Sequence, residues 1–177
     1  MKELTKQERV DRLYLRMAFT WSKNSYALRR QVGCLVVKDN AIISDGYNGT
    51  PSGFPNVCEY AVCPFDEGQS NDTTPDRETM KKRSEDGWNL VTYPIVLHAE
   101  SNAIAKLARS GNSSDGATIY ITDEPCIECS KLIIQSGIKR VVYSRPYRIH
   151  NGIDLLQQAK IEVVNILPAD LIVNKEG

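Results

Sequence analysis

The sequence predicts one α/β domain, and three features of the chain lead to that prediction. Apolar residues recur at helical spacing between about residues 5 and 23, two short β-rich runs follow at 32–38 and 41–47, and helical and extended patterns then alternate from 98 to 166. The chain has 177 residues, of which 41% are apolar, and it contains no long linker rich in Pro, Gly or Ser. We therefore expect residues 1–177 to form a single domain with its own hydrophobic core.

The first helix and the hairpin after it each carry a local signature. Thr5 and Glu8 have the spacing of a capping box, in which both side chains accept hydrogen bonds from backbone N–H groups at the helix start. The apolar residues that repeat with helical periodicity behind this cap are Val10, Leu13, Tyr14, Met17 and Trp21. Asp39 and Asn40 separate the two β-rich runs and are suited to a tight turn, so these runs are predicted to pair as an antiparallel hairpin.

The second half of the chain alternates helices and strands. Helical patterns cover 98–110, 126–136 and 153–160, and strand patterns cover 118–122, 140–143 and 161–166. Pro125 precedes the second of these helices and Gly137 follows it, as is common at helix ends. The predicted order is α-β-β-α-β-α-β-α-β, with helical crossovers between the later strands.

Between these halves, residues 48–93 show no clear periodicity and are rich in Gly, Pro, Asn, Asp and charged residues. One candidate short helix covers 76–85, and Cys58 and Cys63 lie before it. A segment of this length without periodicity is usually functional or mobile rather than a plain connection.

Charge and cysteine content narrow the possible partners and the compartment. The 22 basic residues balance 22 acidic ones, so no overall positive field favours a nucleic-acid partner, although a local pocket can still bind a small anion. The N-terminus lacks the apolar core of a signal peptide, and no run approaches the ~20 apolar residues of a membrane span. Five cysteines without a disulfide framework are typical of a reducing compartment. We expect a soluble, cytoplasmic protein.

Two short motifs carry the strongest chemical signal. The first is His98-Ala99-Glu100, and the second is Pro125-Cys126-Ile127-Glu128-Cys129. Together His98, Cys126 and Cys129 supply an imidazole and two thiolates, which are ligands that Zn²⁺ prefers, and three protein ligands leave a fourth position open for water. The start of a helix stabilises thiolates, and the metal lowers the pKa of its bound water toward ~7. Glu100 is placed to act first as general base and then as general acid.

Other interpretations of these motifs remain open at this point. A Cys-x-x-Cys pair alone is equally typical of a redox pair or of half a structural zinc site, and a His-x-Glu triplet occurs by chance. A structural site would need a fourth ligand such as Cys34, Cys58 or Cys63. The conjunction of both motifs at helix starts, with proline before the first cysteine, favours the catalytic interpretation, since it is the signature of zinc deaminases.

The chain resembles the cytidine deaminase-like superfamily and, within it, the deoxycytidylate (dCMP) deaminases. Beyond the two motifs, the resemblance rests on Arg29-Arg30-Gln31-Val32-Gly33, on Gly46-Tyr47-Asn48-Gly49-Thr50-Pro51-Ser52-Gly53, and on the run 131–138. It implies a three-layer α-β-α fold with a five-stranded mixed sheet flanked by helices. Residues of about 54–93 would then be an insertion in this domain.

The resemblance also implies a function and its regulation. The implied reaction is hydrolytic deamination of dCMP to dUMP and ammonia, which feeds thymidylate synthesis, with one catalytic Zn²⁺. The implied assembly is a homohexamer that dCTP activates and dTTP inhibits, with Mg²⁺ as a companion of the triphosphate effector. The effector site is expected near Gly49, Thr50, Pro51 and Gly53 and the adjoining insertion, at a subunit boundary. No nucleic-acid or membrane partner is implied.

Four further residues are candidates for binding the substrate. Asn48 could hydrogen-bond the sugar or the pyrimidine, and Arg29 could hold the 5′-phosphate, although the neighbouring Arg30 could serve instead. Tyr147 resembles a tyrosine that lies near the nucleotide in the family, and Ala99 would keep the pocket narrow around the base. Each has a purely structural alternative: a turn asparagine, an exposed helix-end arginine, a half-buried aromatic residue and a core alanine.

In some relatives the insertion carries a second, structural zinc, and Cys58 and Cys63 raise that possibility here. The insertion contains no histidine, so such a site would have to recruit Cys34 or carboxylates, and we do not expect it. The alternative is that both cysteines are small apolar residues in a folded loop.

Competing functions come from several classes. A deaminase of dCTP, or of both nucleotides, is the nearest rival, because Arg29, Arg30, Arg145 and Arg148 could hold a longer phosphate chain. A tRNA adenosine deaminase shares the zinc motifs but would need a basic surface and a shorter path from Asn48 to His98. A nucleotide-sensing relative without activity would be expected to lack Glu100, which is present. A structural zinc-binding interaction module is the last alternative.

Overall fold

The computed structural model describes residues 3–63, 76–147 and 150–171. A five-stranded sheet in the order β2-β1-β5-β6-β7 forms its centre. Its strands are β1 (Gly33–Lys38), β2 (Ala41–Tyr47), β5 (Thr118–Asp123), β6 (Arg140–Arg145) and β7 (Glu162–Asn165). β1 pairs antiparallel with β2 and β5, whereas β5, β6 and β7 are parallel. This mixed sheet confirms the predicted fold class.

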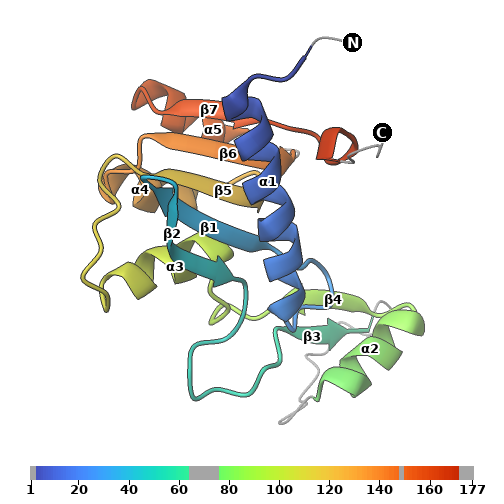
Figure 1. Cartoon of the computed structure of the whole chain (residues 1–177). Helices are drawn as coiled ribbons and strands as arrows, with labels where there is room; N and C mark the ends of the chain where they lie inside the picture. Colours follow the sequence, from blue (N-terminus) through green and yellow to red (C-terminus); the bar gives the residue numbers. More distant parts are fainter. Residues whose placement is uncertain (1–2, 64–75, 148–149, 172–177) are drawn as a thin grey trace.

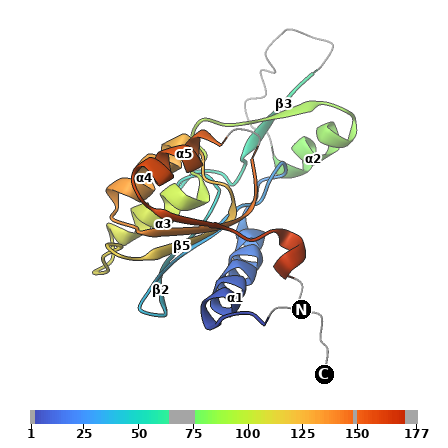
Figure 2. The same ribbon diagram turned by 90° about the horizontal axis from the view of Figure 1, so that it is seen from above.

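Helices cover both faces of the sheet and give three layers (Figures 1 and 2). Helix α1 (Lys6–Trp21) lies on one face, and α3 (Ala99–Leu107), α4 (Ile127–Gln135) and α5 (Asn151–Gln158) lie on the other. Each face has its own apolar core. The core under α1 includes Leu15, Leu35 and Val142, and the core on the opposite face includes Ile119 and Ile133.

Helix α1 begins as predicted, and part of its apolar periodicity faces the core. Thr5 and Glu8 form the capping box, with the Glu8 N–H donating to Thr5 Oγ1 at 3.2 Å and the Thr5 N–H donating to Glu8 Oε2 at 2.7 Å. The buried residues of α1 are Asp11, Leu15 and Ala18, whereas Leu13, Met17 and Trp21 are partly exposed. The apolar spacing therefore predicted the helix, and of the apolar residues that carried it Tyr14 packs against the core while Leu13, Met17 and Trp21 do not.

The inner face of α1 also carries a buried ion pair. Arg140 of β6 donates to both carboxylate oxygens of Asp11, at 2.8 Å each, and the Tyr120 hydroxyl donates to Asp11 Oδ1 at 2.9 Å. A charged residue can lie on the inner face of a helix when it is paired and hydrogen-bonded in this way. Periodicity of apolar residues cannot reveal such a pair.

The predicted hairpin is present, and its turn residues explain it. Asp39 and Asn40, between β1 and β2, have φ values of 51° and 61°. This left-handed conformation at both central positions is the one that two-residue hairpin turns require, and Asn and Asp adopt it more readily than most residues.

The insertion is more ordered than its sequence indicates. Its described residues form a second, two-stranded antiparallel sheet of β3 (Glu59–Val62) and β4 (Asn89–Thr92), with α2 (Arg77–Glu85) beside it. The short helix was predicted at 76–85, but both strands were missed because each has only four residues. Figure 1 shows this unit lying beyond one end of the main sheet, near the end of α1. That one domain spans all 177 residues stays a prediction.

Two 3₁₀ turns complete the described structure, η1 (Ser22–Asn24) after α1 and η2 (Pro168–Leu171) after β7. Helices in the described part of the chain are too short or too polar to cross a membrane.

Candidate active site

Two helix starts bring His98, Cys126 and Cys129 together. His98 and Cys126 are the N-cap residues of α3 and α4, both with extended backbone, and Cys129 lies in the first turn of α4. His98 Nδ1 lies 3.5 Å from Cys126 Sγ and 3.4 Å from Cys129 Sγ. All three donor atoms lie within 4.8 Å of one another, and among the described residues this is the one such group of three or more.

These distances fit a tetrahedral zinc ion. With Zn–S bonds of about 2.3 Å and Zn–N bonds of about 2.0–2.1 Å, tetrahedral angles put nitrogen and sulfur roughly 3.6 Å apart. The two N···S distances are within 0.2 Å of that value, so the side chains already have the spacing that zinc requires. The donor set of one imidazole and two thiols fits Zn²⁺ in its chemistry as well.

Two glycines hold these helix starts close to neighbouring backbone. A Cβ at Gly46 of β2 would collide with the carbonyl oxygen of Ala99, and a Cβ at Gly152 of α5 would collide with the carbonyl oxygen of Pro125. Because glycine lacks this atom, β2 can approach the start of α3, and α5 can approach the residue before Cys126. The backbone next to His98 therefore packs directly against β2, and the backbone next to Cys126 packs directly against α5, with no side chain between them.

The two cysteine thiols shift each other's pKa in opposite directions. The hydrogen bond from Cys129, together with that from His98, lowers the pKa of Cys126 to about 3. The same bond and burial raise the pKa of Cys129 above its ordinary value. The hydrogen bond with Cys126 also raises the pKa of His98. One sulfur is therefore ready to bind a cation without losing a proton.

Glu100 is a buried carboxyl group beside these donors. Only 4% of the residue is exposed. Burial raises the pKa of Glu100 to about 7, against an ordinary 4.5, while its own backbone N–H and the positive charge of His98 act in the opposite direction. A carboxyl group with a pKa near neutrality can both accept and release a proton at cellular pH, as general acid–base catalysis requires.

Asn48 connects the loop before β1 to the loop after β2. Its Oδ1 accepts from the Val32 N–H at 2.8 Å, and its Nδ2 donates to the Arg30 carbonyl at 2.9 Å. The next residue, Gly49, forms a two-way backbone pair with Leu97. The amide of Asn48 thus has a structural role next to the metal ligands, and the predicted contact with substrate stays a prediction.

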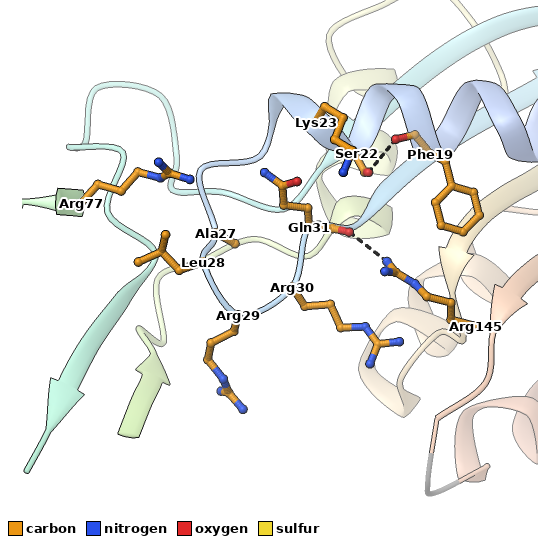
Figure 3. A pocket seen from close by; sticks show the side chains of 10 residues that line it. All are labelled: Phe19, Ser22, Lys23, Ala27, Leu28, Arg29, Arg30, Gln31, Arg77 and Arg145. Atoms are coloured by element: carbon orange, nitrogen blue, oxygen red, sulfur yellow. Dashed lines mark hydrogen bonds between the residues drawn. The ribbon is translucent and has the colours of Figure 1, made fainter. Parts of the chain in front are cut away.

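A basic cavity lies beside this loop (Figure 3). Its volume is about 590 Å³. Figure 3 shows Arg29 and Arg30 extending from the same side of the loop, with Arg145 entering from the end of β6 and Arg77 from the start of α2. Half of the ten residues that line the cavity are cationic and none is acidic; the five are Lys23, Arg29, Arg30, Arg77 and Arg145. Such a surface is suited to a phosphorylated ligand.

Asp123 connects the cavity to the metal ligands. At the carboxyl end of β5, its two oxygens pair separately with Arg30 and Arg145. Asp123 lies three residues before Cys126, and three residues span at most roughly 11 Å. The arginines of the cavity are thereby fixed close to the start of α4.

The other predicted substrate residues lie as follows. Ala99 is 1% exposed and belongs to the apolar core, so its predicted role as a wall of the base pocket is not visible in the structure. Tyr147 is 56% exposed, and its N–H donates to the buried Glu124 at 2.9 Å. Glu124 also contacts His150 Nδ1 at 2.9 Å, so this carboxylate anchors the loop after β6. Arg148 lies outside the described residues.

The expected effector loop and the remaining cysteines can also be placed. Gly49 is held against Leu97, and the Thr50 hydroxyl donates to the Pro55 carbonyl at 3.0 Å. Gly53, with φ of 92°, turns the chain just after Pro51. Cys34 and Cys58 are buried, and Cys63 is half-buried. No second group of metal-ligating side chains occurs among the described residues.

Comparison with known proteins identifies the family. The model of the cytidine and deoxycytidylate deaminase zinc-binding region matches residues 8–145. The chain belongs to the cytidine and deoxycytidylate deaminase family. It is 35% identical to the deoxycytidylate deaminase of Enterobacteria phage T4 over 168 residues, which cover 86% of this chain and 87% of that protein. It is 36% identical to the human deoxycytidylate deaminase, covering 81% of this chain and 71% of the human one.

A solved structure agrees with this assignment. The dCMP deaminase of cyanophage S-TIM5, determined in complex with dCMP and dUMP, has a TM-score of 0.72 and 38% identity, and the match covers 93% of this chain and all of that one. The resemblance to dCMP deaminases inferred from the motifs is therefore confirmed, and this chain is a deaminase of a zinc-binding family.

The structure also reveals residues near the site that the sequence did not indicate. Asp123 and Glu124 could have been noticed as an acidic pair between a strand and Pro125. Glu59 and Arg77 lie in the insertion, where no motif marked Glu59 and where Arg77 belongs to the predicted short helix without any sign of its contacts. Their positions depend on long-range contacts that a single sequence does not show.

Proposed function

We propose that this protein catalyses hydrolytic deamination of dCMP, in which dCMP and water give dUMP and ammonia. The observation that carries the proposal is the buried Glu100 carboxyl group beside His98, Cys126 and Cys129. Relatives named deoxycytidylate deaminase, and the S-TIM5 enzyme solved with dCMP and dUMP, support this choice of substrate.

His98, Cys126 and Cys129 would hold one catalytic Zn²⁺. When bound there, zinc would supply a water molecule of lowered pKa and a positive charge next to the reacting carbon. The pKa of Glu100, about 7, allows its carboxylate to take a proton from the nucleophilic water. Glu100 then returns protons to the ring nitrogen and to the leaving amine, which departs as ammonia.

The 5′-phosphate would bind in the basic cavity. Arg29 is exposed there, and among the described residues its guanidinium makes one long hydrogen bond of 3.4 Å, to the Thr92 hydroxyl, which leaves most of its donors available to a ligand. Asn48 and Tyr147 would contact the nucleoside, and Ala99 would limit the width of the pocket at the base.

A second candidate substrate is dCTP. The cavity presents five cationic side chains, and two of them, Arg30 and Arg145, share the single carboxylate of Asp123. The positive charge in the cavity therefore exceeds what one monophosphate would neutralise. A triphosphate would use this excess charge.

Turnover on dCMP, dCTP, deoxycytidine and CMP tests the proposal. We expect zinc-loaded protein to prefer dCMP and to release ammonia and dUMP in equal amounts. A preference for deoxycytidine would contradict the phosphate-binding role of the cavity, and a preference for dCTP would establish the second candidate.

Glu100→Ala tests the acid–base role. We expect zinc content to be unchanged and kcat to fall by roughly a thousandfold, because the proton transfers lose their carboxylate. Glu78→Ala, which removes an exposed carboxylate of α2, is the control. Near-normal turnover in Glu100→Ala would show that another group moves the protons.

We extend the proposal to regulation on the resemblance alone. The enzyme would be a cytoplasmic homohexamer that dCTP, with Mg²⁺, activates and dTTP inhibits. Its effectors would bind near Gly49, Thr50, Pro51 and Gly53 at a subunit boundary. Sedimentation velocity, and turnover curves with and without each triphosphate, test this; hyperbolic curves that neither triphosphate changes would contradict it.

A further inference from the structure

The segment that carries Arg29 and Arg30 has no helix or strand of its own. It runs between η1 and β1. Both guanidinium groups reach the basic cavity from this segment, so their positions depend on what holds its backbone. Asn48 fixes its end, at Arg30 and Val32. The middle of the segment is held by the insertion.

Glu59 of β3 is the main contact. Its Oε1 accepts from the N–H of Leu28 at 3.1 Å and from the N–H of Arg29 at 3.2 Å, and its Oε2 lies 3.2 Å from the Leu28 nitrogen. Glu59 is 2% exposed, and within the described residues it forms no ion pair. A buried carboxylate without a cation is costly unless hydrogen bonds satisfy it, and here these two backbone amides do so.

The residue opposite Glu59 holds the other end of Arg29. Thr92 of β4 is the register partner of Glu59, and its hydroxyl accepts from Arg29 Nη1 at 3.4 Å. One rung of the β3–β4 hairpin therefore contacts Arg29 at its backbone through Glu59 and at its guanidinium through Thr92. From α2, Arg77 donates to the Tyr26 carbonyl at 3.0 Å and also lines the cavity. The described part of the insertion contacts this segment at three places.

We propose that Glu59 is a positioning residue for recognition of the substrate phosphate. This inference rests on the proposed function. The carboxylate of Glu59 orients the backbone at residues 28–29, so that Arg29 and Arg30 present their guanidinium groups to the cavity before substrate binds. The insertion thereby distinguishes the nucleotide from the nucleoside. Preorganised donors bind more tightly because the binding energy does not have to order them.

Three variants test the proposal. Glu59→Ala removes both acceptor oxygens. Glu59→Gln keeps the Oε1 acceptor, which makes most of these hydrogen bonds, and loses the charge. Thr92→Val removes the contact with the guanidinium at an exposed position where valine suits a strand, so it provides a folded variant even if Glu59→Ala does not fold. Glu85→Gln, which neutralises an exposed carboxylate at the end of α2, is the matched control.

The readout is steady-state turnover on dCMP and deoxycytidine with zinc-loaded protein. We expect Glu59→Ala to raise the KM for dCMP about tenfold, which corresponds to the loss of one charge-assisted interaction, with kcat within about twofold of wild type. Glu59→Gln and Thr92→Val should raise this KM less, and Glu85→Gln should leave it unchanged. For deoxycytidine, kcat/KM should be unchanged in all variants, because that substrate has no phosphate.

Two results would overturn the inference. An equal loss on dCMP and deoxycytidine would show that Glu59 only maintains the fold, and an unchanged KM for dCMP in folded Glu59→Ala and Thr92→Val would show that the segment needs no positioning. Hydrogen exchange at the amides of Leu28 and Arg29 should accelerate in Glu59→Ala irrespective of activity. If wild type did not turn over dCMP, the proposed function would fail by itself, and this exchange measurement would still report on Glu59.

Discussion

The metal-ligand group and the basic cavity lie close together but are built in different ways. His98, Cys126 and Cys129 come from two helix starts, and a pair of short motifs encodes all three. The cavity is assembled from the end of α1, the loop before β1, the start of α2 and the end of β6. The reaction chemistry is therefore encoded locally, whereas substrate recognition depends on distant segments.

This difference suggests a division of tasks. Described residues of the insertion contact the loop that carries Arg29, and Asp123, three residues before Cys126, pairs with Arg30 of that loop. A change in the insertion should alter which substrate binds, and a change at the helix starts should abolish turnover of every substrate. The following predictions test that division.

The largest effect is expected at a metal ligand. Cys126→Ala should lose zinc and reduce kcat/KM at least a thousandfold for dCMP and deoxycytidine alike, because two protein ligands hold zinc poorly. Metal analysis and turnover check this. Cys63→Ala, a half-buried cysteine of the insertion, should retain zinc. Loss of zinc in that control as well would mean that the insertion holds metal.

The Asp11–Arg140 ion pair under α1 lies outside both the metal-ligand group and the basic cavity, so a change there should affect stability without changing substrate preference. Asp11→Asn should lower the free energy of unfolding by about 3 kcal/mol at pH 7, because Arg140 loses its buried partner. Substrate preference should not change. Denaturant unfolding and the ratio of turnover on the two substrates measure this, and a shifted preference would link α1 to recognition.

The same pair predicts how stability depends on pH. Burial raises the pKa of Asp11, but hydrogen bonds from Arg140 and Gln7 outweigh it and hold this pKa below 3.8. Its stabilisation is therefore complete above about pH 5, begins to fall as the unfolded-state carboxyl group takes up protons, and is lost as pH falls through the lowered folded-state pKa. The stability difference between wild type and Asp11→Asn should be constant from pH 7 to about 5 and should narrow below that.

The smallest of these effects separates the two substrates. Arg29→Ala should raise the KM for dCMP roughly tenfold and leave turnover of deoxycytidine unchanged, since only the nucleotide uses the guanidinium. Arg109→Ala, which removes an exposed arginine after α3, is the control. A fall in kcat on both substrates would show that Arg29 takes part in the reaction step, and it would contradict the proposed separation of recognition from catalysis.

The fold was largely predictable because its signals are local. The capping box at Thr5, the turn at Asp39 and Asn40, and the proline and glycine around α4 each act within a few residues. The burial of Asp11 in α1 was not predictable, since its partner Arg140 lies far along the chain. The strands of the insertion were too short to show a period.

For the site, the same limit applies. The donor atoms lie as the spacing of His98, Cys126 and Cys129 predicts, because each motif starts a helix. The structure does not test whether Asn48, Tyr147 or Ala99 contacts substrate, or which residues bind effectors. Glu59 could not be found from the sequence, since its partners are two backbone amides and a backbone amide leaves no signature in residue identity.

The glycines behind the two helix starts have a consequence for how this protein can vary. Gly46 and Gly152 have no side chain, yet a single methyl group at either would displace the backbone that carries a metal ligand. Tolerance to substitution near the metal ligands should therefore depend on the space between neighbouring backbone segments as much as on the chemistry of the side chains. In a library of variants selected for activity, substitutions of Gly46 and Gly152 should be depleted nearly as strongly as substitutions of Cys126 and Cys129.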